Sequence, residues 1–314
     1  DTLFPYTTLF RSLNTSALSG SECIYLRLLI TGAGEKDVKF VMIDEVQDYT
    51  ETQLIVLGKY FSRAHFLLLG DSNQAIWEDT ATFGQIEKIF SATHGEDAVS
   101  TCKLLTSYRS SPEITALFTS LLCEEERGQT SSVQRGGKKP EFFEVVTDNK
   151  DNERAEYLQT MKSLIEQAQE FDGLTAIVCT EKSRVRWLAK QLEGVFAEGG
   201  NDAADGATDG VAGNGTTQAN GAAQVNGAAQ AKPRTGVKVL TSHDSLPAKG
   251  VVLLDLALAK GLEFDQVIVA DAQEEVYKAD GISRRRLYTA LSRAMHHVMV
   301  VSQGKMTSLL SKLL

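Results

Sequence analysis

The chain has few cysteines, and their spacing suits neither a metal site nor a disulfide framework. Four cysteines are scattered over 314 residues, and no two of them form a C-x-x-C pair. This argues against a zinc-ribbon site and against the disulfide-rich secreted class. A reducing compartment suits such a chain best, so we expect a cytoplasmic protein.

Long apolar runs are also absent. No stretch reaches the roughly 20 consecutive apolar residues that a membrane-spanning helix needs, so we expect no membrane contact. Residues 1–12 begin with Asp1 and carry only a short, broken apolar run, which does not fit a signal peptide. They resemble translated adapter sequence, and we leave them out of the fold prediction.

Positive charge is in deficit. The formal net charge is −9 and the isoelectric point is about 5.2. Proteins that bind nucleic acid through its phosphates are usually basic over the contact surface. The charge therefore argues mildly against a dedicated nucleic-acid binder, although a local basic groove is compatible with it.

Apolar strands alternate with amphipathic helices along the first part of the chain. The expected strands are residues 38–44 and 65–71, and the expected helices are 50–61 with Thr50 as N-cap, 83–90, and one that begins near Pro112. Such alternation predicts an α/β fold with parallel sheets.

The second part of the chain repeats the alternation. The expected strands are residues 141–146, 174–180, 237–246, 250–258, 266–272 and 296–302, and the expected helices are 150–170, 182–193, 283–295 and 306–314. Between the two parts, residues 124–140 are polar and rich in glycine. We therefore predict one domain over residues 13–125 and a second over 126–314.

A low-complexity segment interrupts the second domain at residues 194–236. It consists mainly of Gly, Ala, Asn and Gln and includes a short NGAAQ repeat. Such a segment buries too little apolar surface to offset the entropy lost on ordering. We expect a disordered surface insertion.

The strand at 38–44 ends in acids, within the stretch VMIDEVQD. Ligands of open parallel sheets bind at the carboxyl ends of the strands. There Asp44 can hold Mg²⁺, and Glu45 can orient an attacking water. This is the Walker B pattern of nucleotide hydrolases, but from these residues alone a strand that ends in an acidic turn is an equally open interpretation.

Two further stretches follow in the first domain. In LLLGDSNQ, Gln74 lies three residues after Asp71, and its neutral amide suits contact with a γ-phosphate. In SYRS, Tyr108 can stack on a base and Arg109 offers a planar fork of donors to phosphate. Each stretch by itself is weak evidence, since a Gly-Asp turn or a surface arginine is common.

Two more stretches lie in the second domain. AKGLEFD carries Gly261 and Glu263 on a polar loop between two strand-like runs, and LYTALSRA places Arg293 at the end of a helix. The plain alternative for Arg293 is a solvated helix face.

The order of these five stretches is more informative than any one of them. DEVQD, GDSNQ, SYRS, AKGLEFD and LYTALSRA occur in this sequence and resemble motifs II, III, IV, V and VI of the UvrD/Rep-like superfamily 1 helicases. DEVQDYT with QLIVL, and GDSNQAI, look closer to the HelD branch, which acts on RNA polymerase. The resemblance implies two RecA-like domains of the P-loop NTPase type.

The resemblance also implies roles for individual residues. Asp44 would help hold Mg²⁺, and Glu45 would activate the water that attacks the γ-phosphate of ATP. Gln74 would contact that phosphate and the water. Tyr108 would stack on the adenine.

The remaining matched residues would complete the nucleotide site. Arg109 and Arg293 would clamp the γ-phosphate from the two domains, and an arginine finger can be worth roughly 10³–10⁵ in rate. Glu263, beside Gly261, would lie near the ribose. Closure of the two domains on ATP would then drive the motor.

Three departures from the helicase pattern stand out. No GxxxxGK[ST] loop occurs in the chain, so we interpret it as a C-terminal part whose first RecA-like domain is incomplete, and we expect no efficient ATP hydrolysis by this chain alone. Trp77 follows GDSNQAI without the usual Trp-Arg-Gly. The stretch Asp255-Leu256-Ala257-Leu258-Ala259, apolar after its first residue, replaces the Thr-x-His that contacts DNA in the helicase pattern.

These observations leave three functions open. The first is a monomeric ATP-dependent DNA helicase or translocase. The second is a HelD-like ATPase whose partner is RNA polymerase, favoured by the acidic charge and the missing DNA contact. The third is a non-catalytic binding module.

Overall fold

The computed structural model describes residues 19–104, 106–107, 109–127, 131–134, 136–198 and 236–311. The chain divides into two compact units. Unit 1 comprises the chain up to Arg135 together with Tyr277–Ser292, and unit 2 comprises Gly136–Val276 together with Arg293–Leu314. The domain prediction placed the boundary ten residues earlier, at 125/126, and assigned residues 277–292 to the second domain.

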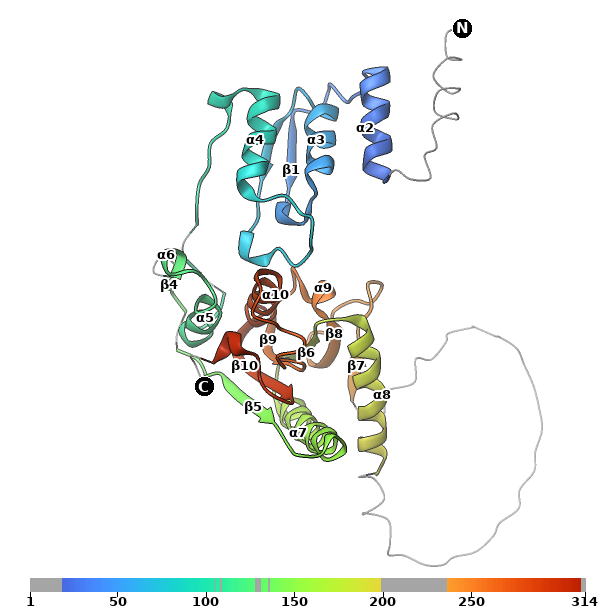
Figure 1. Cartoon of the computed structure of the whole chain (residues 1–314), viewed down its shortest axis with the longest axis vertical. Helices are drawn as coiled ribbons and strands as arrows, with labels where there is room; N and C mark the ends of the chain where they lie inside the picture. Colours follow the sequence, from blue (N-terminus) through green and yellow to red (C-terminus); the bar gives the residue numbers. More distant parts are fainter. Residues whose placement is uncertain are drawn as a thin grey trace, which may run out of the picture. The chain divides into compact units, whose positions relative to one another are not determined.

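Unit 1 is built on two parallel strands. β1 (Phe40–Ile43) pairs with β2 (His65–Leu68) in the register Ile43↔Leu68, and helix α3 (Glu51–Tyr60) connects them. α3 and α4 (Phe83–His94) supply the apolar side chains that pack against one face of this sheet, with Leu54 and Phe90 in its core. Figure 1 shows these two helices beside β1.

The other face of this sheet is apolar and exposed. Phe40 is 74% exposed, Met42 71% and Leu67 48%. Because side chains alternate along a strand, Val41 and Ile43 point the opposite way and join the core.

Local capping explains where the helices of unit 1 begin. Thr50 accepts from the N–H of Gln53, whose side chain bonds back to Thr50, so the predicted N-cap is confirmed. Helix α2 (Gly20–Thr31) was not predicted. Its apolar residues follow no clear stripe and none is buried, yet Ser19 forms a capping box with Glu22.

The rest of unit 1 consists of short elements. They are η2 (Val46–Asp48), η3 (Ser72–Gln74), η4 (Glu96–Ala98), β3 (Thr106–Ser107), α5 (Pro112–Thr119), α6 (Glu124–Arg127), β4 (Ser131–Ser132) and α10 (Gly281–Leu291). Helix α10 packs on α5, where the rings of Phe118 and Tyr288 meet edge to face with centroids 5.1 Å apart.

Unit 2 holds a six-stranded parallel sheet in the order β5-β10-β9-β6-β8-β7. The strands are β5 (Glu141–Val145), β6 (Leu174–Cys179), β7 (Val237–Val239), β8 (Gly250–Asp255), β9 (Phe264–Val269) and β10 (Ala294–Gln303). Every residue of β6 is buried, as expected for a central parallel strand. The predicted α/β class with parallel sheets is therefore confirmed.

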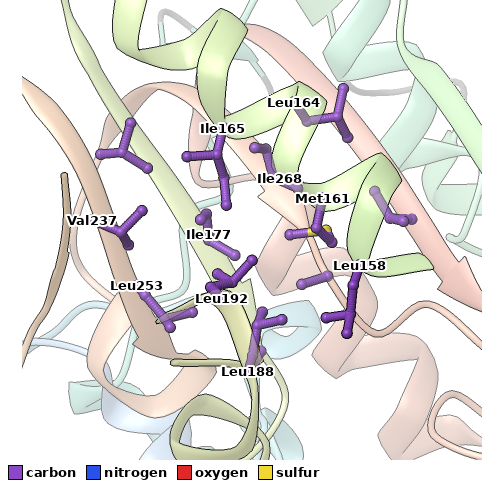
Figure 2. Close-up of a cluster of buried hydrophobic side chains, with 14 of the residues drawn as sticks. Leu158, Met161, Leu164, Ile165, Ile177, Leu188, Leu192, Val237, Leu253 and Ile268 are labelled. Atoms are coloured by element: carbon purple, nitrogen blue, oxygen red, sulfur yellow. The ribbon is translucent and has the colours of Figure 1, made fainter. Parts of the chain in front are cut away.

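Helices α7 (Lys150–Glu170) and α8 (Lys182–Glu198) form one layer of the unit 2 core. In Figure 2, Met161 and Ile165 of α7 and Leu188 of α8 lie over Ile177 of β6. Helix α8 continues to Glu198, beyond the start of the insertion predicted at 194–236. Residues 199–235 of that prediction, and residues 1–12, lie outside the described residues.

Three predicted elements of unit 2 are wrong in extent. The strand predicted at 250–258 ends at Asp255, and helix α9 (Leu256–Ala259) follows because the Asp255 side chain caps it. Of the strand predicted at 237–246, only Val237–Val239 (β7) forms a strand. In place of the predicted helix at 306–314, the described residues hold the 3₁₀ turn η5 (Ser308–Leu310).

No helix in the described ranges combines the length and the apolar character needed to cross a membrane.

Candidate functional site

The loops that follow β1 and β2 are joined by backbone hydrogen bonds. The N–H of Leu69 donates to the carbonyl of Ile43 over 2.8 Å, and the N–H of Val46 donates to Leu69 over 2.9 Å. The ladder thus continues past both strands. It holds the acids after β1 beside the Gly70-Asp71 turn after β2.

Glu45 has a left-handed backbone, with φ 52° and ψ 42°. Its N–H donates to Oδ1 of Asp44 over 2.9 Å. A non-glycine residue in this region carries a cost of roughly 1–2 kcal/mol, and such strain is concentrated at functional sites. The turn separates the two carboxylates, so that Asp44 is exposed while Glu45 is half-buried.

Gln47 connects the two strand ends. Its side chain is 1% exposed. Its amide nitrogen donates to the Glu45 carboxylate, and its Oε1 accepts from the N–H of Asp71 over 3.1 Å. No role was predicted for Gln47, although it lies in the same DEVQD motif.

Gly70 makes room for Gln47. A Cβ at position 70 would lie 2.3 Å from Oε1 of Gln47 and 3.0 Å from Cγ1 of Val46. Only glycine permits this approach, so the Gly-Asp pair after β2 is a packing requirement of the site as well as a turn.

Gln74 is oriented by Asp71. Its Nε2 donates to Oδ2 of Asp71 over 2.9 Å, while Oδ1 accepts from the N–H of Asn73 over 2.9 Å. A continuous hydrogen-bonded series therefore runs from Glu45 through Gln47 and Asp71 to Gln74.

The acids at the tip of β1 fit magnesium better than a protein-only metal cage. Within the described residues, no group of three or more His, Cys, Asp and Glu side chains is arranged to hold a metal ion. Mg²⁺ in nucleotide sites usually takes one or two carboxylates and completes its shell with water and phosphate oxygens. The exposed Asp44 offers such a single carboxylate.

The SYRS stretch begins at Ser107, the last residue of β3, and Arg109 precedes α5 in unit 1. Tyr108 is outside the described residues, and Arg109 is exposed. The structure therefore places Arg109 on the loop that leads into α5 of unit 1.

In unit 2, the predicted residues gather around the loop between α9 and β9. Gly261 has φ +79°, a left-handed conformation that favours glycine, and the next acid, Glu263, is exposed. Arg293 is 1% exposed. Its Nη1 donates to the carbonyl of Leu262 over 3.4 Å, and its own carbonyl accepts from Phe264 over 3.0 Å.

The structure thus forms two groups. Asp44, Glu45 and Gln74 come together in unit 1, and Gly261, Glu263 and Arg293 come together in unit 2. The residue that sequence reasoning missed is Gln47. Gln47 lies two residues after the acid pair, which is a visible feature of the sequence. Its partner Asp71 is 24 residues away, so their hydrogen bond could not be predicted from the motif.

Comparisons with known proteins found one solved structure and one family model that are similar to parts of this chain. A crystal structure of the C-terminal domain of a possible DNA helicase from Lactobacillus plantarum WCFS1 is 25% identical, with a TM-score of 0.40, and the match covers 66% of this chain and 94% of that chain. A search of curated proteins finds no match. Residues 250–301, from β8 into β10, match the family model of the UvrD-like helicase C-terminal domain. The matched stretch contains the Gly261 loop and Arg293.

Proposed function

We propose that the protein is the motor part of a superfamily 1 DNA helicase or translocase of the UvrD/Rep type, which couples ATP hydrolysis to the movement of two RecA-like domains. The observation that carries the proposal is the series from Glu45 through Gln47 and Asp71 to Gln74. It fixes a carboxylate and an amide at the carboxyl ends of neighbouring parallel strands, where phosphates bind in such sheets.

In this proposal the two acids divide the work. Asp44 contributes an oxygen to Mg²⁺, which would neutralise charge on the β- and γ-phosphates. Glu45, held by the Gln47 amide, accepts a proton from the attacking water. Gln74 contacts the γ-phosphate and the water.

The arginines supply positive charge. Arg109 in unit 1 and Arg293 in unit 2 are proposed to stabilise the γ-phosphate, Tyr108 to stack on adenine, and Glu263 beside Gly261 to lie near the ribose. Arg293 already donates to the Leu262 carbonyl, so a change at the nucleotide would reach the Gly261 loop through it.

The test is an ATPase assay on the longest form of the protein that its gene encodes. We expect Mg²⁺-dependent turnover that Glu45→Gln lowers by about 10²–10⁴-fold, the usual contribution of a general base. Glu78→Gln, which changes an exposed acid of the same unit, is the matched control. Equal rates for wild type and Glu45→Gln would overturn the proposal.

The chain contains no GxxxxGK[ST] loop, so we expect the 314-residue chain by itself to turn over ATP very slowly. A steady Mg²⁺-dependent rate in this chain that Glu45→Gln abolishes would contradict that expectation. If no form of the protein hydrolyses or binds ATP, the function is that of a binding module.

A second candidate, a HelD-like ATPase that remodels RNA polymerase, is favoured by α9. Leu256 and Ala259 of this helix are buried, and the Asp255 side chain caps it. Together with the net charge of −9, this weakens the case that α9 contacts a DNA strand. The two candidates differ in DNA binding.

Fluorescence anisotropy with labelled single-stranded DNA separates them. A helicase predicts tight binding whose logarithm falls linearly with the logarithm of salt concentration, with a slope of about −0.7 per phosphate contact. A HelD-like factor predicts weak DNA binding at all salt concentrations and co-purification of RNA polymerase with the full-length protein.

A further inference from the structure

Two arginines of helix α10 bond to the backbone that directly follows Gln74. Nε of Arg285 donates to the carbonyl of Ala75 over 2.8 Å. Nε of Arg286 donates to the carbonyl of Ile76 over 3.1 Å. Each contact joins residues 210 positions apart in the sequence, and all of these residues belong to unit 1.

The geometry fixes orientation as well as distance. Successive residues of an α-helix point about 100° apart, so two neighbouring side chains reach successive carbonyls only if the loop crosses the helix at a set angle. Charge-assisted hydrogen bonds of this kind are stronger than neutral ones. The loop from η3 is therefore held at two points.

Helix α10 is itself well anchored. Asp280 caps its first turn by accepting from the N–H of Ser283 over 2.7 Å. Tyr288 packs edge to face on Phe118 of α5, and Thr289 donates to the carbonyl of Arg285 over 2.8 Å. The two arginines thus project from a rigid support.

The same helix leads directly to the proposed arginine finger. α10 ends at Leu291, and Arg293 follows after one intervening residue, before β10 begins at Ala294. At the other contact, Ala75 follows Gln74 immediately. The two arginines therefore hold the loop at the residues that directly follow Gln74.

We propose that Arg285 and Arg286 are positioning residues that couple the Gln74 loop to helix α10 and thereby hold Gln74 in place for its proposed contact with the γ-phosphate. This inference rests on the proposed function, because it assigns the coupling of that same site. The arginines act through the loop backbone and need no contact with the nucleotide.

Hydrogen exchange on the 314-residue chain tests the coupling without ATP. The N–H groups of Asn73 and Gln74 are both bonded to Asp71, so they report whether the loop is held. We expect Arg285→Gln and Arg286→Gln to speed their exchange by about tenfold or more, the scale of losing a hydrogen bond from a charged donor. The double variant should exceed either single one.

Arg284→Gln is the matched control, since Arg284 is the exposed neighbour on the same helix. It should leave the loop amides unchanged. Lysine at 285 or 286 keeps the charge and one donor but not the planar fork, so it should restore part of the protection. Unchanged exchange in both glutamine variants, or an equal acceleration throughout β1 and β2, would overturn the proposal.

Kinetics on the longest encoded form then separate positioning from simple stabilisation. We expect both glutamine variants to lower kcat for ATP by about tenfold with KM within about twofold, because an interaction realised in the transition state acts on kcat, and lysine to recover part of the loss. A faster-exchanging loop with wild-type kcat would overturn the positioning role while leaving the proposed function intact. If wild type shows no ATPase at all, the proposed function fails, and the exchange arm alone decides the coupling.

Discussion

At the scale of single residues, the tip of β1 depends on one glycine. Gly70→Ala would bring a Cβ to 2.3 Å from Oε1 of Gln47. The Gln47 amide would have to move, which breaks its bonds to Glu45 and Asp71. Since these groups are partly or fully buried, we expect unit 1 to lose about 1–3 kcal/mol.

Urea unfolding measures this loss, with Trp77 fluorescence as the probe in a Trp187→Phe background. Gly84→Ala is the control, because a Cβ there meets no atom within 4 Å. In helix α4 the added methyl group should be neutral or stabilise by up to about 1 kcal/mol. A Gly70→Ala protein as stable as Gly84→Ala would contradict the packing argument.

A second residue links unit 2 to pH. Asp271 is 1% exposed, and its Oδ2 accepts from the N–H of Thr180 over 2.8 Å. Burial raises the pKa of this carboxyl to about 6, while the Thr180 N–H and the Arg184 guanidinium oppose the rise. In the folded protein, burial therefore favours the protonated, neutral carboxyl of Asp271 over the ionised carboxylate.

The sign of the effect follows from the raised pKa. Below the ordinary aspartate pKa the carboxyl is neutral in both states and costs nothing. As pH rises from about 4 through about 6, the unfolded chain ionises first, so the free energy of unfolding falls by on the order of 2–3 kcal/mol. Asp271→Asn should remove this fall, measured by urea unfolding at pH 4.5 and pH 7.5 with Trp187 fluorescence.

The matched control is Glu275→Gln, which alters an exposed acid nearby in sequence and should keep the wild-type pH dependence. The same pH dependence in Asp271→Asn and wild type would show that another group titrates.

At the scale of elements, helix caps stabilise unit 1. Thr50 caps α3 through the N–H of Gln53, and removing such a cap costs about 1 kcal/mol. We expect Thr50→Ala to lower the free energy of unfolding of unit 1 by that amount. Ser111→Ala at the start of α5 is the control. Its hydroxyl makes no cap bond and is buried without a partner, so its loss should be neutral or mildly stabilising in the same urea assay.

The helices and strands also show how much of the secondary structure sequence patterns can predict. The strands around β1, β2, β6 and β9 were predicted because each is a short apolar run between turns. The apolar run 250–258 was overextended, because periodicity alone does not separate a buried strand from a buried helical turn. Only the cap formed by Asp255 explains why the strand stops there.

The site was predictable in part for a similar reason. Parallel strands end on one edge, so the acids after β1 and the amide after β2 had to lie close together. The contact of Gln47 with Asp71 and those of Arg285 and Arg286 with the loop after Gln74 are long-range. No local sequence pattern predicts these contacts.

At the scale of the whole molecule, unit 1 is assembled from two distant parts of the chain. Its main part ends at Arg135, and its helix α10 comes from Tyr277–Ser292, between strands of unit 2. A chain that stops at Arg135 loses the Tyr288 ring from Phe118 and both arginines from the loop after Gln74. We therefore expect residues 1–135 alone to show fast exchange at α5 and at the Gln74 loop.

A peptide of residues 277–292 should restore this protection when added in trans. Within one chain the helix is present at an effective concentration of the order of millimolar, so the peptide is needed at about that level. The same peptide with glutamine in place of Arg285 and Arg286 should protect α5, where only the Tyr288 contact is needed, but leave the Gln74 loop fast. Full protection of both segments in residues 1–135 without any peptide would mean that α10 is dispensable for unit 1. The two peptides thus distinguish packing of the helix on α5 from the hold that its arginines exert on the loop.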